Sequence, residues 1–303
     1  MMMVSPGQKL HDRAVATNSN SLIVLRDGQL DEQISFGMDH DPLYIMSISK
    51  FVTGLGLGSI FTAARVDIDQ PVAEFFPEWR QGRKQRITIR MLMNHTSGLQ
   101  NAADTGVDLE AAPDMVQLAL CAELDADPGA EFSYNNKAVQ LLAGVVQRAA
   151  GRSLDGLLTE HLFAPLGIQS ASWAYDLNGS PYIAGGLSMS AWDLARIGQL
   201  VADGGLYRGH QVIPEEWVAT MSAPGQTLHQ DFGLLSMRWL RRGTDNLLGV
   251  YHSGWLGQYL VVCGEAQLVA VRTISRERGI GHDGTDFADF LDYLEPMVTT
   301  SQR

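Results

Sequence analysis

The sequence predicts an α+β fold in which one sheet is built from both ends of the chain and a mostly helical domain is inserted between them. Two observations support this prediction. Strand-like segments gather before residue 40 and after residue 230, and the residues between them alternate helical stretches with Pro and Gly breaks. We therefore expect an α/β domain of residues 1–64 and 230–303 and a helical domain of residues 65–229. A cleft between two such parts is a common place for a small-molecule site.

The first elements are expected to be a β-hairpin and a long helix. Residues 21–25 (Ser-Leu-Ile-Val-Leu) and a segment ending at residues 34–37 have strand character, and Asp27-Gly28 between them favours a tight turn. From residue 47 to about residue 64 the pattern becomes helical. Its apolar residues form one stripe: Ile48, Phe51, Val52, Leu55 and Ile60.

Strand character returns late, at residues 232–239, 258–262 and 268–271, and a helix is expected from about residue 285 to 298. Within the first helix, the run from Gly54 to Ser59 resembles a dinucleotide-binding fingerprint. It lacks the last glycine and does not follow a strand, so it indicates close helix packing instead.

The composition disfavours several classes of partner. A net charge of -12 and a pI near 5.0 argue against nucleic acid, which needs clustered Lys and Arg. No run of about 18 apolar residues could span a membrane, and the first 22 residues lack the apolar stretch of a secretory signal. We expect a cytoplasmic protein acting on a small molecule. The eight histidines show no zinc-ligand spacing, so neither a metal nor a cofactor is expected.

The first candidate motif is Ser47-Ile48-Ser49-Lys50 at the start of the predicted helix. Residues three apart share a helix face, so the Lys50 amine can reach the Ser47 hydroxyl. Burial beside apolar neighbours would lower the lysine pKa and make the amine a base. The Ser47 amide, at a helix start, can face an oxyanion. Taken alone, the motif is explained better by a helix-capping serine and a surface lysine.

The second candidate motif is Tyr134-Asn135-Asn136, which follows a Pro-Gly turn. A tyrosine hydroxyl beside a lysine can move a proton to or from a serine and a leaving group. Asn136 could hold a substrate amide through its carbonyl and NH2 groups. The alternative is a half-buried tyrosine followed by a helix N-cap.

The third candidate motif is His252-Ser253-Gly254-Trp255, which leads into a late apolar strand. A glycine lets a substrate lie along a strand edge, and the Trp255 N–H could be a second oxyanion donor. His252 and Ser253 would then line the site. The alternative is a hairpin corner with a structural histidine.

The three motifs occur once each, in this order, and together they resemble the serine β-lactamase and penicillin-binding-protein superfamily. The nearest branch includes class C β-lactamases, β-lactamase-like carboxylesterases and 6-aminohexanoate-dimer hydrolase. Residues 92–99 and 185–196 also look like that branch, and the resemblance covers roughly residues 20–295. It implies a β-lactamase/transpeptidase-like fold with an antiparallel sheet, flanking helices and an active site in the cleft beside the helical domain.

The resemblance also implies roles for the first two motifs. Ser47 matches the acylated serine, Lys50 its partner lysine and Tyr134 the proton-shuttling tyrosine. Asn136 matches the asparagine that faces the substrate. No Gly-x-Ser-x-Gly motif is present, which disfavours an α/β-hydrolase triad.

In the third motif, His252-Ser253-Gly254 occupies the substrate-binding strand that usually reads Lys-Thr-Gly in β-lactamases. Trp255 then matches the residue whose N–H completes the oxyanion hole with that of Ser47. His252 departs from the lysine of β-lactamases, which weakens the expectation of β-lactam recognition.

We therefore expect a serine hydrolase that cleaves an ester or amide bond of a small substrate through an acyl-enzyme. Acyl transfer to an amine or alcohol and β-lactam hydrolysis are the enzymatic alternatives, and a catalytically idle binding or sensor domain is the alternative from another class. The sequence indicates neither the acyl and leaving groups nor the oligomeric state.

Overall fold

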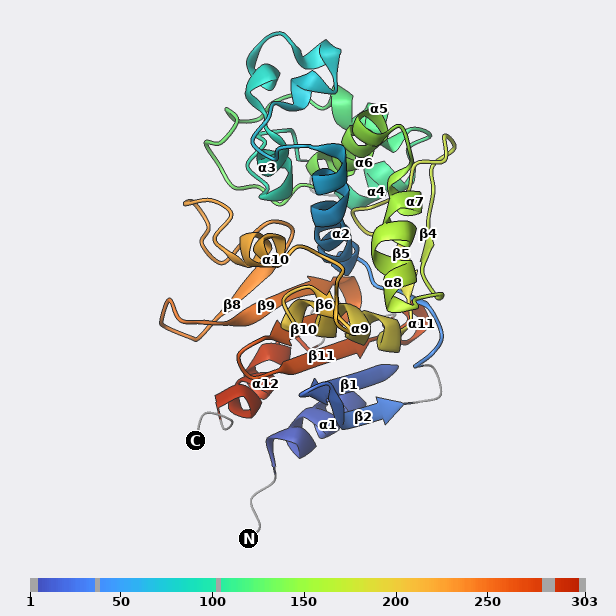
Figure 1. The fold of residues 1–303 in the computed structure, drawn as a ribbon. Helices are drawn as coiled ribbons and strands as arrows, with labels where there is room; N and C mark the ends of the chain where they lie inside the picture. The colour runs from blue at the N-terminus through green and yellow to red at the C-terminus, as the bar shows by residue number, and fades with distance from the viewer. Residues whose placement is uncertain (1–4, 36–38, 102–104, 280–286, 300–303) are drawn as a thin grey trace.

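The computed structural model describes residues 5–35, 39–101, 105–279 and 287–299. Its main sheet has six antiparallel strands in the order β2-β1-β11-β10-β9-β8, so the two ends of the chain meet at its centre (Figure 1). Its strands are β1 Ser21–Arg26, β2 Gln29–Ser35, β8 Met237–Leu240, β9 Leu247–Gly254, β10 Gln258–Cys263 and β11 Leu268–Thr273. This is the α+β fold that the sequence predicts.

Short strands form two smaller sheets, one of β3 Leu43–Tyr44, β5 Leu187–Met189 and β4 Ser172–Trp173, the other of β6 Leu206–Tyr207 and β7 His210–Gln211. The helices are α1 Pro6–Ala16, α2 Ile48–Ala64, α3 Ile89–Met93, α4 Thr105–Glu110, α5 Met115–Cys121, α6 Asn136–Ala150, α7 Leu154–Leu158, α8 Ala164–Leu166, α9 Ala191–Ala202, α10 Glu215–Ser222, α11 Arg276–Gly279 and α12 Phe290–Thr299. Short helical turns are η1 Val72–Glu74, η2 Pro77–Trp79, η3 Arg83–Arg86, η4 Thr159–Phe163 and η5 Trp255–Gly257.

The predicted hairpin is confirmed by β1 and β2. Asp27 and Gly28 form its two-residue turn with φ of 49° and 70°, values that suit an Asp-Gly type I′ turn. The continuous apolar run of β1 reflects burial on both faces. Leu22 and Val24 pack in the core beneath α1 and α12, whereas Ile23 and Leu25 belong to the larger core on the other face.

The helix α2 confirms the helical prediction for residues 47–64 and lies at the centre of the molecule. It contacts α6, α7 and α10 on the helical side and β9 and β10 of the sheet (Figure 1). Its glycines permit this packing, as the sequence indicates. A Cβ atom at Gly56 would lie 2.2 Å from a Leu158 methyl, and one at Gly58 would lie 2.3 Å from the Trp217 ring.

One predicted strand is shorter in the structure than expected. Residues 232–236 form no strand beyond a single bridge between Phe232 and Met237, and β8 begins only at Met237. The expected hairpin end at residues 36–37 lies outside the described residues. The expected start of the last helix at residue 285 also lies outside them, and the described helix α12 begins at Phe290. The division at residues 64/65 and 229/230 stays a prediction. The helix α9, from the segment assigned to the helical domain, packs on β1, β10 and β11.

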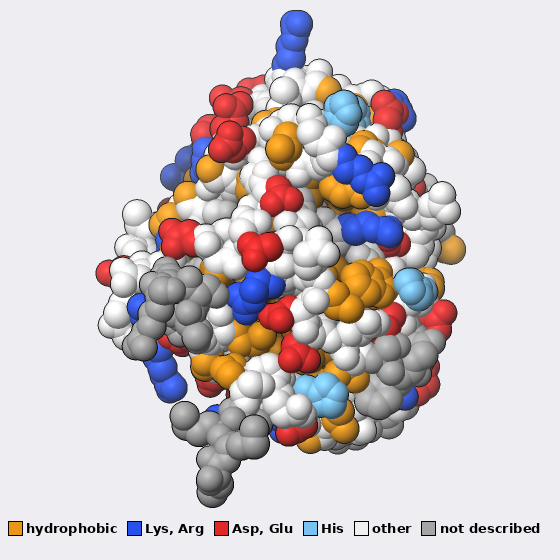
Figure 2. Space-filling view, turned by 60° about the horizontal axis from the view of Figure 1, so that its bottom comes forward, with side chains coloured by type: hydrophobic (Ala, Val, Ile, Leu, Met, Phe, Trp, Pro, Cys, Tyr) orange, Lys and Arg blue, Asp and Glu red, His pale blue; other side chains and the backbone are white. Residues whose placement is uncertain are grey.

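Charges are spread over the face shown in Figure 2, where Asp and Glu side chains alternate with separate Lys and Arg side chains. Within the described ranges, no helix combines the length and the apolar character needed to cross a membrane.

We predict that Gly58→Ala destabilises the protein by about 1–3 kcal/mol, because the rigid Trp217 ring must move to admit a methyl group. The matched control is Gly156→Ala in α7, where the nearest atom is the Ser153 hydroxyl oxygen at 3.2 Å. Helix propensity favours alanine there by up to about 1 kcal/mol. Urea unfolding of both variants checks the prediction, and an equal free energy of unfolding for the two would contradict it.

Candidate active site

Ser47 lies directly before α2, in a tight segment tied to β5. Met46 has a φ of 52°, and its carbonyl accepts a hydrogen bond of 2.6 Å from the Ser49 hydroxyl. The same hydroxyl oxygen accepts a 3.1 Å bond from the Leu187 N–H. These bonds orient the Ser47 amide as one of the helix-start N–H groups that have no intrahelical partner.

Lys50 lies one turn along α2 with its amine fully buried. Its Nζ donates to the Ser47 Oγ at 3.1 Å and to the Ala184 carbonyl at 2.5 Å. Burial lowers the pKa of Lys50 to about 7, because the charged form loses its hydration. A substantial fraction of the amine is therefore neutral near pH 7 and can accept the Ser47 proton.

The Ala184 carbonyl is positioned by Gln140, a buried residue of α6 that the sequence analysis did not single out. The Gln140 side-chain oxygen accepts from the Ile183 N–H at 3.1 Å, and its amide nitrogen donates to the Pro181 carbonyl at 2.8 Å. This clamp fixes the loop that supplies the second acceptor to Lys50.

Tyr134 completes the group around Ser47. Its ring centroid lies 4.9 Å from the Lys50 Nζ, and the nearby Ser47 side chain lowers the pKa of its hydroxyl, although less than burial raises it. Burial raises the pKa of Tyr134 above its usual value of 10. The hydroxyl is therefore protonated near neutral pH and suited to donate a hydrogen bond or a proton. The structure thus brings Ser47, Lys50 and Tyr134 together, as the sequence motifs predict.

His95 supports Tyr134 from behind, and sequence reasoning placed it in a family-like stretch without assigning it a role. Its ring packs at 4.5 Å from the Tyr134 ring, and its Nδ1 accepts a 3.0 Å bond from the Asn135 N–H. The ring proton must therefore be on Nε2. Asn135 also caps α6, since its side-chain oxygen accepts from the Ala138 N–H at 3.0 Å. The N-cap is thus Asn135, while Asn136 is the first helical residue.

His252 lies beneath the site and does not line its cavity. The side chain is fully buried, and its Nδ1–H donates to the Ser253 carbonyl at 2.7 Å. Burial, with a further effect of the nearby Lys50 charge, lowers the pKa of His252 to about 3. The residue is neutral at physiological pH, so the third motif carries no cation at this position.

Gly254 lets β9 pass closely against the segment before Ser47. A Cβ atom there would lie 2.6 Å from the Ile45 carbonyl oxygen and 2.9 Å from the Met46 Cβ. Trp255 follows, with a side chain that is 54% exposed. Its backbone N–H belongs to the turn η5, which directly follows the strand β9. Ser253 is partly exposed beside it.

The turn η5 is held by a buried arginine from β11. Arg272 donates to the Leu256 and Gly257 carbonyls at 3.2 and 2.6 Å. The same guanidinium donates to the Thr17 carbonyl at 2.8 Å and the Ser19 hydroxyl at 2.7 Å. The residues after Trp255 are therefore anchored to the amino-terminal end of the chain.

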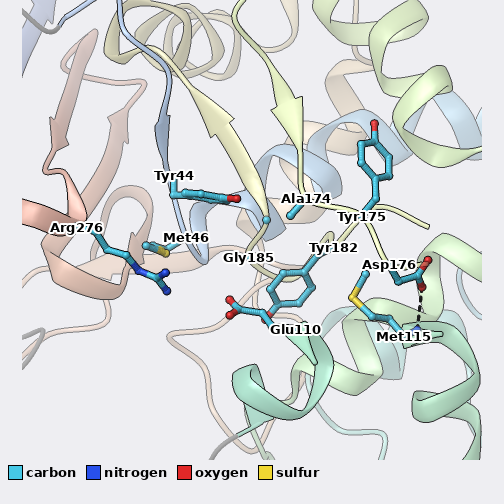
Figure 3. A pocket seen from close by; sticks show the side chains of 11 residues that line it. Tyr44, Met46, Glu110, Met115, Ala174, Tyr175, Asp176, Tyr182, Gly185 and Arg276 are labelled. Atoms are coloured by element: carbon cyan, nitrogen blue, oxygen red, sulfur yellow. Dashed lines mark hydrogen bonds between the residues drawn. The ribbon is translucent and has the colours of Figure 1, made fainter. Parts of the chain in front are cut away.

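A cavity of about 310 Å³ opens over the nucleophile and is lined by Ser47, Asn136 and Trp255. It adjoins a second cavity of about 230 Å³, with which it shares Glu110, Tyr182 and Arg276 (Figure 3). Sequence reasoning missed these three residues, because none belongs to a motif. Among the described residues, no group of three His, Cys, Asp or Glu side chains lies close enough to bind a metal ion.

Comparison with known proteins agrees with this geometry. The family model described as Beta-lactamase matches residues 9–292, nearly the whole chain. The chain belongs to the beta-lactamase family. The antiparallel sheet, the flanking helices and the Ser-x-x-Lys at the start of α2 are therefore features of a beta-lactamase-family fold.

Proteins similar to this chain carry names that describe different activities. The chain is 27% identical over 239 residues to the 6-aminohexanoate-dimer hydrolase of Paenarthrobacter ureafaciens, covering 71% of this chain and 60% of that protein's length. A Bacillus anthracis structure provisionally described as such a hydrolase aligns with a TM-score of 0.83 at 18% identity, over 97% of this chain and 83% of that one. EstCE1, described as a hydrolase with promiscuous acyltransferase activity, aligns with a TM-score of 0.73 at 15% identity, over 95% and 97% of the two chains.

We predict that His95 carries its proton on Nε2 and His252 on Nδ1, and that both rings stay uncharged between pH 6.5 and 8. Burial lowers the pKa of His95 well below 6.5, and His252 titrates only near pH 3. Two-bond proton–nitrogen correlation spectra of the labelled protein distinguish the tautomers. The opposite tautomers, or an imidazolium signal in this range, would disprove this arrangement.

Proposed function

We propose that this chain is a serine hydrolase that cleaves an ester or amide bond of a small substrate through an acyl-enzyme. The observation that carries the proposal is the buried Lys50 amine, with a pKa of about 7, at 3.1 Å from the Ser47 hydroxyl. Membership of the beta-lactamase family supports it, as do relatives that are named as hydrolases. No cofactor takes part in the proposed chemistry.

In acylation, neutral Lys50 accepts the Ser47 proton while Oγ attacks the substrate carbonyl. The carbonyl oxygen becomes an oxyanion, which the Ser47 and Trp255 N–H groups stabilise by hydrogen bonds. The bond to the leaving group then breaks. Tyr134 donates its proton to the departing amine or alkoxide and recovers a proton from Lys50. The acyl group then stays on Ser47, and the Lys50 side chain is neutral again.

In deacylation, the same groups act on water. A water molecule entering the cavity loses a proton to the Lys50–Tyr134 pair as its oxygen attacks the acyl carbon. The oxyanion forms again at the Ser47 and Trp255 amides, and the proton returns to Oγ as the acid leaves. Asn136, which lines the cavity, would hold a substrate amide. Ser253 and Gly254 end the strand β9 directly before Trp255 and would bind the substrate along that strand.

Acyl transfer is the second candidate function. The structural likeness to EstCE1, which is described as having promiscuous acyltransferase activity, supports this candidate. The same acyl-enzyme would be intercepted by an amine or alcohol, so product analysis with added amine separates transfer from hydrolysis. Turnover of a chromogenic cephalosporin tests whether the protein is a β-lactamase. The covalent labelling described next tests whether it is a catalytically idle binding domain. Buried, neutral His252 offers no cation where β-lactamases carry the third-motif lysine.

We predict that Ser47→Ala abolishes labelling by a fluorophosphonate and lowers turnover of a nitrophenyl ester at least about a thousandfold, as for other nucleophiles in cooperating sets. Intact mass spectrometry and peptide mapping locate the adduct, and circular dichroism confirms folding. Ser153→Ala, at an exposed serine, is the matched control and should label as the wild type does. Labelling at another residue in Ser47→Ala would refute the assignment.

We also predict that acylation depends on the neutral form of Lys50. Since the pKa of Lys50 is about 7, the neutral fraction rises about tenfold per pH unit well below 7 and levels off above about pH 8. The second-order rate of fluorophosphonate labelling should follow this curve. Stopped-flow or quenched labelling between pH 5 and 10 measures it, and a rate that keeps climbing to pH 10 would rule out a lysine of lowered pKa as the base.

A further inference from the structure

The Gln140 side chain links α6 to the backbone segment that contacts Lys50. Gln140 lies one helical turn after Asn136, the first residue of α6, and is fully buried. Its side-chain oxygen accepts from the Ile183 N–H at 3.1 Å, and its amide nitrogen donates to the Pro181 carbonyl at 2.8 Å. Both polar groups of this side chain are thus bonded to one short segment of backbone.

That segment is a turn that Gln140 holds from outside. The Gly186 N–H donates to the Tyr182 carbonyl at 2.7 Å and closes the turn. Ile183 and Ala184 lie between these two residues, at 0% and 1% exposure. The bond from the Ile183 N–H to Gln140 therefore fixes the residue directly before Ala184.

The Ala184 carbonyl limits how a neutral Lys50 amine can be oriented. A neutral amine has two N–H groups and one lone pair, whereas a carbonyl oxygen can only accept. At 2.5 Å from the Ala184 oxygen, Nζ must therefore point an N–H at it. This leaves the lone pair and one N–H for the side that faces the Ser47 hydroxyl, 3.1 Å away. Without the carbonyl the amine could rotate, and its lone pair would face Oγ for a smaller fraction of the time.

The titratable side chains around Lys50 supply no charge near pH 7. Tyr134 precedes α6, His95 follows α3 and His252 lies on β9. Burial raises the pKa of the tyrosine and lowers the pKa of both histidines, so all three are neutral. In the described part of the chain, no ion pair involves Lys50. The Ala184 carbonyl is therefore the polar group best placed to stabilise the ammonium form.

We propose that Gln140 is a positioning residue for acylation, which directs the Lys50 amine toward Ser47 by holding the turn that carries the Ala184 carbonyl. Gln140 acts through the backbone and not by contact with the substrate. Since α6 begins directly after the Tyr134-Asn135 pair, this helix then positions both proton-transferring side chains. The proposal rests on the proposed hydrolase function.

The first test is Gln140→Met, which removes both hydrogen bonds and keeps the length of the side chain. The stopped-flow burst of a nitrophenyl ester gives the acylation rate constant and the ester dissociation constant separately. We expect the rate constant on the alkaline plateau to fall about 10- to 100-fold, and the dissociation constant to change less than about threefold, as for a misplaced reacting group. Gln147→Met is the matched control on an exposed position of the same helix and should behave as the wild type.

The Lys50 pKa distinguishes this role from a general loosening of the core. The chain has four lysines, Lys9, Lys50, Lys84 and Lys137, so a 13C label at lysine Cε allows each titration to be followed by NMR. A carbonyl stabilises an ammonium more than a neutral amine. Its displacement in Gln140→Met should therefore move the Lys50 pKa below its value of about 7. Water entering a loosened core would instead raise this pKa toward 10.5.

Gln140→Glu is the conservative variant, and it carries the test if Gln140→Met does not fold by circular dichroism. Its side chain still accepts from the Ile183 N–H, so the turn should stay in place. The added negative charge favours the ammonium and should raise the Lys50 pKa, opposite to the effect of Gln140→Met. At a pH where the NMR signal shows Lys50 to be neutral, the acylation rate constant should return close to that of the wild type.

The outcomes separate this proposal from the hydrolase function. An acylation rate constant in Gln140→Met close to that of the wild type, or a Lys50 pKa that stays or rises in this variant, overturns the role of Gln140. A loss of rate in Gln140→Glu as large as in Gln140→Met, with Lys50 neutral in both, also overturns it. Labelling at Ser47 upholds the hydrolase in each of these cases, whereas its absence in the wild type overturns the hydrolase function itself.

Discussion

The burial of one amine is the constraint on which the rest of this structure depends. Lys50 lies at the centre of the molecule, where its Nζ meets only the Ser47 hydroxyl and the Ala184 carbonyl as hydrogen-bond acceptors among the described residues. Transfer of an ammonium from water to such a place costs several kcal/mol, so the neutral amine is favoured. The helix α2 imposes this burial, because it is packed on nearly all sides by helices and sheet.

The surroundings keep that amine free of a compensating charge. No described ion pair involves Lys50, and the two imidazoles near it are held uncharged by burial. Each imidazole has one nitrogen committed to the backbone, His95 to the Asn135 N–H and His252 to the Ser253 carbonyl. A carboxylate in their place would stabilise the lysine cation and raise its pKa. The uncharged surroundings of Lys50 are therefore as important to the proposed base as the Ser-x-x-Lys motif itself.

The two sides of the site are joined by bonds between distant parts of the chain. The Gln140 side chain holds the loop that carries Ala184 on the helical side. On the sheet side, Arg272 connects the turn after Trp255 to Thr17 and Ser19 near the start of the chain. Since the proposed oxyanion donors come from the start of α2 and from this turn, both connections determine how the nucleophile faces the rest of the cavity.

The sequence by itself determined the elements that depend on local pattern. The hairpin of β1 and β2, the helix α2 and the strands β10 and β11 follow from apolar periodicity and turn residues. The placement of Ser47 and Lys50 on one helix face follows from their spacing. Tyr134 could be associated with them only through the resemblance to a family, because nothing local brings it to α2.

Only the tertiary structure decided the features that depend on contact between distant segments. The Ala184 carbonyl is a backbone group without a sequence signature, and the burial of His252, expected from sequence to face a substrate, depends on what packs over β9. The position of α9 on the sheet and the meeting of Glu110 with Arg276 at one cavity are likewise set by how separate elements pack. Periodicity reports which face of a segment is apolar, whereas desolvation, and with it the charge state of Lys50 and His252, depends on the neighbours that folding supplies.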